Sequence, residues 1–274
     1  MYGAILGDMI GAPYEFARGR IGKDFPLFTG GSRFTDDTVM TIAVADALLK
    51  VQPEEVESVL RNELIDALHR WGSRYPHAGY GGGFRKWLKS GSREPYYSFG
   101  NGSAMRVSAA GWLYDDLETT WIMAAITAII THNHPEGVKG AEATASAIFL
   151  ARNGADKDEI RAYITDTFGY DLSLTCAEIR RTDRLTTSCQ RTVPEAITAF
   201  LEGESLEDVI RTAVSLGGDC DTLGCIAGSI AEAYDGVPTE LVAECRKRLP
   251  ADMLAGLDRF VRQSRPASPN RLVK

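Results

Sequence analysis

Cysteine and histidine are scarce in the sequence, which limits the disulfide and metal chemistry that it can support. Five cysteines and four histidines occur among 274 residues. The cysteines are odd in number, widely spaced and free of any C-x-x-C pair, a pattern typical of reduced thiols in a cytoplasm. We therefore expect a cytoplasmic protein with small buried thiols and without a disulfide framework.

The sequence also has no excess of basic residues and no long apolar run. The 30 Lys and Arg residues face 37 Asp and Glu residues, so the formal net charge is −7. This balance argues against non-specific nucleic-acid binding, because a phosphate backbone needs a basic surface. The apolar run from Trp121 to Ile130 is too short to span a bilayer, and the N-terminus lacks the basic start of a signal peptide. We expect a soluble monomer that makes no contact with membranes.

Strand-like alternation of apolar and polar residues is absent, whereas helical periodicity is frequent. The periodicity, with glycine and proline as stop and start signals, predicts helices at 39–49, 53–71, 138–152, 160–168, 206–216, 223–234 and 251–263, with further starts at Pro194 and Thr239. The first long helix is expected to stop at Gly72, and Ser205 to Asp208 is typical of a capping box. The sequence predicts an all-α fold: a compact single-domain orthogonal helical bundle of roughly a dozen helices over residues 1–264. Residues 265–274 are predicted to form a loosely ordered tail.

Two acidic segments stand directly before predicted helices: Thr35-Asp36-Asp37-Thr38 and Gly217-Gly218-Asp219-Cys220-Asp221-Thr222. Each could serve simply as helix N-caps. Adjacent carboxylates repel one another unless a cation neutralises them, however, and paired glycines allow a tight turn that brings the second pair of aspartates together. Two oxygen-rich clusters far apart in the sequence suggest one hard-cation site with two ions, magnesium or manganese, assembled in space.

Glycine-rich segments supply further candidate residues. The loop Asn101-Gly102-Ser103 enters a helix, where free amides could bind a phosphate group or where Asn101 could be a plain N-cap. Gly81 and Gly82, within the segment Gly79–Gly83, offer either more amides or a flexible connector. The spacing of Gly7 and Gly11 favours close helix packing.

Glu15 and two histidines complete the candidates. Glu15 follows Pro13 in a predicted loop and is free to act at a site. His132 and His134 end an apolar helix, and C-terminal capping or a hydrogen bond to a ligand is favoured there over zinc binding. A nucleophile elbow and a Cys–His setting are both absent, which disfavours covalent catalysis.

In their order and number, these segments resemble the ADP-ribosylglycohydrolase family, whose bacterial members include the dinitrogenase reductase-activating glycohydrolase. The resemblance covers nearly the whole chain. It rests on Gly7-Asp8, Gly11, Glu15, Phe34-Thr35-Asp36-Asp37-Thr38, Gly100-Asn101-Gly102-Ser103-Ala104-Met105-Arg106, Thr131-His132 and Gly217-Gly218-Asp219-Cys220-Asp221-Thr222.

The resemblance implies an all-α globule with two divalent cations, Mg²⁺ or Mn²⁺, at the base of a cleft. By residue-to-residue match, the metal ligands would be Thr35, Asp36, Asp37, Asp219, Asp221 and Thr222. The substrate would contact Asn101, Gly102, Ser103 and His132, with Gly81 and Gly82 as further contacts. Glu15 matches a glutamate beside the metals.

The implied reaction is hydrolysis of the bond at ribose C1″ of an ADP-ribosylated protein or small ADP-ribosyl conjugate, which releases ADP-ribose. Bound metals would lower the pKa of a water molecule and hold it for attack. The general base would be a carboxylate not consumed by the metals, from the set Glu15, Asp36, Asp37 and Asp219.

Two other functions compete with this one. The chain could be a catalytically inactive relative that binds ADP-ribose or has a structural role, but a scaffold has no need of four clustered aspartates. A metal-dependent phosphohydrolase acting on a nucleotide is a weaker alternative, because His-Asp ligand pairs are absent from the sequence. Hydrolysis of ADP-ribosyl conjugates is therefore the prediction.

Overall fold

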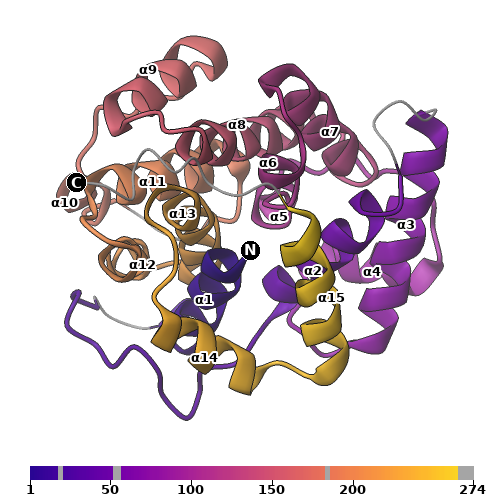
Figure 1. Cartoon of the computed structure of the whole chain (residues 1–274), viewed down its shortest axis with the longest axis horizontal. Helices are drawn as coiled ribbons and strands as arrows, with labels where there is room; N and C mark the ends of the chain where they lie inside the picture. Colours follow the sequence, from indigo (N-terminus) through magenta and orange to yellow (C-terminus); the bar gives the residue numbers. More distant parts are fainter. Residues whose placement is uncertain (18–20, 52–56, 183–185, 265–274) are drawn as a thin grey trace.

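Helices carry all the regular structure of the described residues. The computed structural model describes residues 1–17, 21–51, 57–182 and 186–264 (Figure 1). Its elements are α1 (Tyr2–Gly11), η1 (Ala12–Tyr14), α2 (Asp36–Leu48), α3 (Glu57–Arg74), α4 (Gly82–Ser90), α5 (Gly102–Met105), α6 (Ala110–Leu113), α7 (Leu117–Ile129), α8 (Pro135–Arg152), α9 (Lys157–Phe168), α10 (Cys176–Ile179), α11 (Cys189–Glu202), α12 (Leu206–Ser215), α13 (Cys220–Asp235), α14 (Thr239–Arg248) and α15 (Ala251–Gln263). The predicted all-α, single-domain fold is confirmed. The predicted tail, 265–274, lies outside the described residues.

Several helix ends follow the local signals in the sequence. Helix α9 ends at Gly169, which adopts the left-handed conformation that glycine tolerates best. Helix α15 spans the predicted range, and α14 begins at Thr239 as predicted. Ser205 caps α12, but Asp208 accepts its hydrogen bond from the amide of Glu204, so only half of the predicted capping box forms. Local signals therefore set these ends to within a residue or two.

The predicted starts at 39, 138, 160 and 223 lie about one turn inside the observed helices. Two other predicted ends are wrong because packing overrides the local signal. Helix α3 continues past Gly72 to Arg74, and Gly72 provides the space into which Leu88 of α4 packs, since a Cβ there would lie 2.8 Å from the leucine methyls. Helix α11 begins at Cys189, five residues before the start predicted at Pro194. Its first turn buries Cys189 and Val193 completely, which offsets the hydrogen bond that the internal proline removes.

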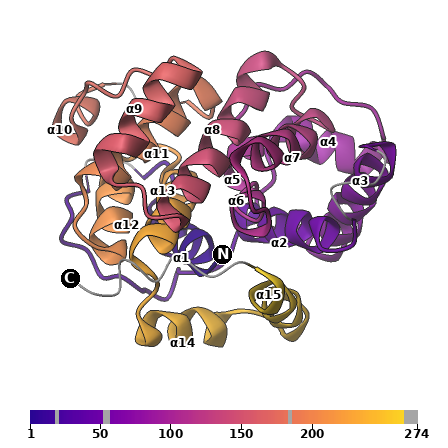
Figure 2. The same ribbon diagram turned by 45° about the horizontal axis from the view of Figure 1, so that its top comes forward.

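Helix α13 lies at the centre of the fold, beside α1 (Figures 1 and 2). It contacts α1, α2, α8, α11 and α12, and every residue from Cys220 to Ala233 is buried. Small and apolar residues on all sides of the helix permit this position. The N-terminal helix approaches it very closely: a Cβ on Gly7 would lie 2.0 Å from the carbonyl oxygen of Gly224, and one on Gly11 would lie 2.4 Å from Cα of Asp221. The predicted role of Gly7 and Gly11 in close packing is confirmed.

The remaining helices surround this pair. Helix α2 packs against α3 and α15, and α8 packs against both α7 and α13. Helices α14 and α15 lie at one edge of the molecule (Figure 2). All five cysteines are buried free thiols, as predicted. Among the described residues, no helix is both long and apolar enough to cross a membrane.

Candidate metal centre and ligand pocket

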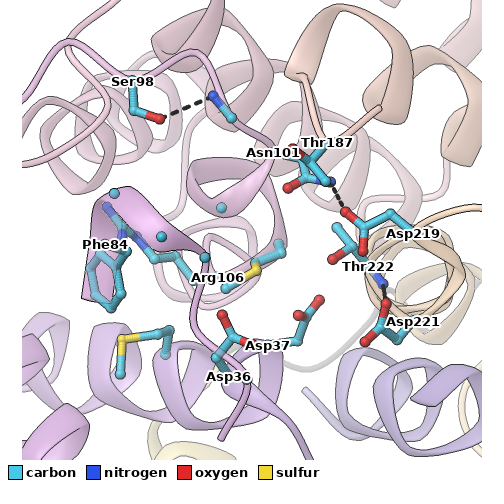
Figure 3. A pocket seen from close by; sticks show the side chains of 18 of the residues that line it. Asp36, Asp37, Phe84, Ser98, Asn101, Arg106, Thr187, Asp219, Asp221 and Thr222 are labelled. Atoms are coloured by element: carbon cyan, nitrogen blue, oxygen red, sulfur yellow. Dashed lines mark hydrogen bonds between the residues drawn. The ribbon is translucent and has the colours of Figure 1, made fainter. Parts of the chain in front are cut away.

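A cavity of about 410 Å³ opens where the N-termini of α2, α4, α5 and α13 converge. Figure 3 shows Asp36 and Asp37 on one side of it and Asp219, Asp221 and Thr222 on another. The walls include most of the residues predicted for the site: Glu15, Asp36, Asp37, Gly81, Gly82, Asn101, Gly102, His132, Asp219, Asp221 and Thr222. Thr35 and Ser103 are buried next to the cavity but are not part of its lining. The fold thus brings together side chains that are up to about two hundred residues apart in the chain.

At the start of α2, Thr35 caps the helix and the next two residues direct their carboxylates into the cavity. Thr35 is the N-cap, and its hydroxyl accepts a hydrogen bond from the amide of Asp37. The amide of Asp36 donates to the carbonyl of Ala78 at 2.8 Å. Because Thr35 performs the capping, the carboxylates of Asp36 and Asp37 are left to face the cavity.

Asp8 of α1 holds this segment in place, although its position in the sequence predicts no role at the site. Its carboxylate is completely buried and accepts hydrogen bonds from the amide and hydroxyl of Thr35, at 2.9 and 2.8 Å, and from the amide and hydroxyl of Thr38. The hydroxyl proton of Thr35 therefore points to Asp8, which leaves the oxygen lone pairs of Thr35 for other partners. The sequence shows Asp8 as part of the Gly7-Asp8 motif and as a carboxylate that interrupts an otherwise apolar helix, and neither feature predicts its role.

On the α13 side, two left-handed glycines shape the turn that presents the carboxylates. Gly217 and Gly218 have φ angles of +79° and +69°. Asp219 is the N-cap of α13, yet its side chain makes no capping hydrogen bond and instead accepts one from the amide group of Asn101 at 2.6 Å. Asp221 accepts from the amide of Thr222 at 2.9 Å. The alternative interpretation of Asp219 and Asn101 as plain N-caps is therefore wrong. Neither side chain makes a capping hydrogen bond, and the two bond to each other instead.

Glu15 brings a third segment to this side of the cavity. It ends η1, and the next residue, Phe16, donates its amide to the carbonyl of Gly218 at 2.8 Å, which ties the Glu15 loop to the glycine turn. Carboxylate oxygens of Glu15, Asp219 and Asp221 all lie within 4.8 Å of one another. Three carboxylates at this separation can share one cation.

The electrostatics of the cluster favour a bound cation. Burial, and then the charge of Asp8, raise the pKa of Asp36 to about 7. Burial and neighbouring carboxylates raise the pKa values of Asp37 and Asp221 well above the usual range, and burial raises that of Asp219. Among the described residues, no Lys or Arg forms a salt bridge with these four aspartates, so their charge is not compensated by the protein.

One atom in the cluster is left without any partner. Oxygen Oδ1 of Asp37 is buried and accepts no hydrogen bond from a described residue. A buried carboxylate oxygen without a partner is costly, and a cation would satisfy it. The donors are carboxylate and hydroxyl oxygens, which suit Mg²⁺ or Mn²⁺ and not zinc. The residues present therefore fit the predicted group.

The glycine segments and His132 form the rest of the cavity. Gly81 is the N-cap of α4 without any side chain to cap it, and Gly82 begins the helix, so free amides face this region. Gly102 begins α5, and His132 is buried beside it. The hydroxyl of Ser103 donates to the carbonyl of Gly137 at 2.6 Å, which directs this side chain toward α8 and away from the cavity. His134 is the N-cap of α8, whereas the sequence predicted that it caps the C-terminus of the preceding helix.

Comparison with known proteins agrees with this geometry. The sequence matches the ADP-ribosylglycohydrolase family over residues 1–270. The chain belongs to the ADP-ribosylglycohydrolase family. ADP-ribosylhydrolase ARH3 of Mus musculus is 28% identical to this chain. The alignment, 334 positions long, covers 92% of this chain and 88% of that protein. ADP-ribosylarginine hydrolase Tri1 of Pseudomonas putida is 26% identical, with coverage of 86% of this chain and 70% of that protein.

Solved structures support the fold of this family member. A structure described as an ADP-ribosylglycohydrolase-related protein complex has a TM-score of 0.70 and 22% sequence identity, covering 96% of this chain and 95% of that one. The match at this identity supports the all-α fold alone. Resemblance to the dinitrogenase reductase-activating type in particular stays a prediction.

Further residues of this family member line the cavity, although the sequence assigns none of them an individual role at the site. They are Phe16, Met40, Gly79, Gly83, Phe84, Tyr96, Ser98, Gly100, Met105, Arg106 and Thr187. Arg106 is the most unusual of them, because its side chain is buried and has no carboxylate partner among the described residues. The sequence shows Arg106 as the last residue of a motif that carries the family resemblance, and this motif does not reveal its burial.

Proposed function

We propose that the protein is a metal-dependent hydrolase that cleaves the glycosidic bond at ribose C1″ of ADP-ribosyl conjugates and releases ADP-ribose. The observation that carries the proposal is the convergence of Asp36, Asp37, Asp219 and Asp221, all with raised pKa values, on one cavity in a chain of this family. The relatives' names, ADP-ribosylhydrolase and ADP-ribosylarginine hydrolase, support the same reaction class.

Thr35, Asp36, Asp37, Asp219, Asp221 and Thr222 would hold two divalent cations, Mg²⁺ or Mn²⁺. Such ions supply Lewis-acid chemistry, which lowers the pKa of a bound water. Asn101 fixes the orientation of Asp219 through the 2.6 Å hydrogen bond and is itself held by Thr192 at 3.1 Å. Asp8 orients Thr35 in the same way from the other side.

Glu15 is the carboxylate best placed to accept a proton from the attacking water. It is exposed, whereas the aspartates are largely buried, and it makes no hydrogen bond to another described residue. Partial burial and the charge of Asp219 raise its pKa. A carboxylate that is not bound to other protein groups is free to take a proton and release it to solvent.

The cavity can also hold the ADP-ribosyl group itself. Its volume of about 410 Å³ lies within the usual range for small-molecule sites. The amides at the start of α4, around Gly81 and Gly82, suit a phosphate oxygen without any need for a basic surface. Asn101, Gly102 and His132 line the same cavity, where a ribose would find polar groups to contact.

The deciding experiment measures ADP-ribose release from arginine-, serine- and nucleobase-linked conjugates by the purified protein with Mg²⁺ or Mn²⁺. Asp36→Asn and Asp219→Asn should abolish turnover, while Asp66→Asn, at a surface carboxylate paired with Arg93, should leave it unchanged. Failure to release ADP-ribose from any linkage would sink the proposed reaction. Tight ADP-ribose binding without turnover would instead favour the inactive relative.

A further inference from the structure

Arg106, Thr131 and His132 form a buried hydrogen-bonded chain at one end of the cavity. Arg106 is 1% exposed and lies beside Phe84, at the end of the pocket away from Asp219 and Asp221 (Figure 3). Its Nη2 donates to the carbonyl of Thr127 at 2.9 Å and to the hydroxyl of Thr131 at 2.8 Å. A guanidinium can only donate, so Thr131 must accept in this contact.

The second contact of the Thr131 hydroxyl fixes the state of His132. Oxygen Oγ1 of Thr131 lies 2.8 Å from Nδ1 of His132. The hydroxyl has a single proton, and among the described residues Nδ1 is the only acceptor in contact with it. If Nδ1 carried the proton, the buried hydroxyl proton of Thr131 would have no acceptor, which is costly. Thr131 therefore donates to Nδ1, and Nδ1 is unprotonated.

An unprotonated Nδ1 leaves the imidazole proton on Nε2. This nitrogen faces the glycine loop: a Cβ on Gly102 would lie 3.1 Å from Nε2, and one on Gly100 would lie 3.6 Å from it. No described residue accepts a hydrogen bond from Nε2. Both glycines and His132 line the cavity, so the donor is directed toward a bound molecule.

The doubly protonated ring is disfavoured at this position. His132 is 4% exposed, and burial followed by the charge of Arg106 lowers its pKa well below the ordinary value of 6.5. The ring is therefore neutral near pH 7, and a neutral imidazole has one donor and one acceptor. Its acceptor is used by Thr131, which leaves the donor for the cavity.

We propose that Thr131, held by Arg106, is a positioning residue that locks His132 as the neutral Nε2–H tautomer, a hydrogen-bond donor to an oxygen of the bound ligand. Gly100 and Gly102 keep the path to this donor open, because side chains there would lie against Nε2. The tautomer follows from the contacts of Thr131 with Arg106 and His132, and only the identity of the ligand, an ADP-ribosyl group, rests on the proposed function. The donor suits a phosphate or ribose oxygen and rejects a ligand that presents an N–H group there.

The first test is ¹⁵N NMR of the histidine side chains in the ligand-free protein at pH 7, with His132 assigned from the signals lost in His132→Gln. We expect the wild-type spectrum to show an unprotonated Nδ1 and a protonated Nε2. Thr131→Val should bring the two nitrogen signals toward each other, because both tautomers become populated, while Thr131→Ser should restore the wild-type pattern. Thr144→Val is the matched control and should leave the spectrum unchanged, since its buried hydroxyl donates to the carbonyl of Gly140 and takes no part in this chain.

The second test adds ADP-ribose in the presence of Mg²⁺. The Nε2 signal of His132 should shift on binding, and Thr131→Val should weaken binding roughly tenfold, the value of one hydrogen bond. A protonated Nδ1 in the wild-type protein, or an unchanged spectrum in Thr131→Val, would overturn the proposal. So would an Nε2 signal that does not move when ADP-ribose binds. Absence of ADP-ribose binding would overturn the proposed function, while the tautomer would still stand or fall on the ligand-free spectrum.

Discussion

Two buried carboxylates in the same cluster are used in opposite ways. Asp8 accepts four hydrogen bonds from Thr35 and Thr38, so both of its oxygens are satisfied by the protein. Asp37 keeps a buried oxygen without a partner among the described residues. At the scale of single residues, this difference separates the carboxylate that organises the site from one that is available to a cation.

Asp8→Asn tests this division of roles. The carboxamide oxygen can replace Oδ2 and keep the bonds from the amides of Thr35 and Thr38. The NH₂ group would then face the Thr35 hydroxyl and turn the hydroxyl proton toward the acidic cluster. We expect the melting temperature to change little, because a buried charge is removed with few bonds lost, and Mn²⁺ affinity to fall roughly tenfold.

Titration calorimetry with Mn²⁺ and thermal unfolding measure the two effects of Asp8→Asn separately. Asp8→Ala is the comparison, since it removes all four acceptors and should destabilise the fold by about 3 kcal/mol. Unchanged Mn²⁺ affinity in Asp8→Asn would show that Thr35 is not oriented by Asp8.

At the scale of helices, α1 connects the two halves of the site. Its glycines touch α13 directly, and Asp8 on the same helix holds the start of α2. Gly7→Ala should therefore disturb the whole arrangement, because the new methyl would lie 2.0 Å from the carbonyl oxygen of Gly224. We expect a loss of about 3 kcal/mol in unfolding free energy, at the upper end for overpacking.

Urea unfolding of Gly7→Ala alongside Gly30→Ala measures this loss. Gly30 is exposed, and a Cβ added to it would have no atom within 4 Å, so its substitution tests the general effect of alanine. Equal stability of the two variants would contradict the close-packing role of α1.

Asp46 joins three helices and makes their packing sensitive to acid. From α2 it accepts hydrogen bonds from Arg70 of α3 at 2.8 Å and from Arg259 of α15 at 2.9 Å. Burial raises its pKa, but the Arg70 hydrogen bond and the charge of Lys50 outweigh this and lower it below the ordinary 3.8. The stabilisation is therefore complete above pH 3.8 and is lost as the pH falls through the folded-state pKa.

We expect wild-type stability to fall more steeply below about pH 4 than that of Asp46→Asn, which cannot titrate. Urea unfolding of both proteins at a series of pH values measures the difference. Parallel pH profiles would show that Asp46 contributes nothing to the acid sensitivity.

Helix content was predictable where helices have amphipathic periodicity and local end signals, as in α9 and α15. The end of α3 and the start of α11 could not be predicted. Gly72 and Pro194 are local stop and start signals, but tertiary packing overrides both of them in the fold. Local chemistry sets a helix end unless a neighbouring element uses the same residue for packing.

At the scale of the whole molecule, the acidic clusters could be predicted from the sequence. Neighbouring carboxylates repel one another, so their occurrence side by side indicates a functional role. Asp8 and Arg106 stand in motifs that carry the family resemblance, but their roles were missed because these depend on burial, which arises from elements distant in the chain. The formal charge of −7 likewise says nothing of where the charge lies. In the fold, Glu15 and four aspartates surround one cavity, and a bound cation would compensate the mutual repulsion that opposes folding.

Divalent cations should therefore stabilise the entire fold. Binding to the native state alone adds about 2.7 kcal/mol when the free ion is at 100 times its Kd, which corresponds to a rise of about 5 °C in melting temperature for a chain of this size. Thermal unfolding with Mn²⁺, with Mg²⁺ and with a chelator measures the shift. Asp221→Asn should lose most of it, because this residue contributes a carboxylate to the cluster with Glu15 and Asp219. Asp66→Asn, at the surface, should retain it, and an equal shift in both variants would mean that the ions act elsewhere on the molecule.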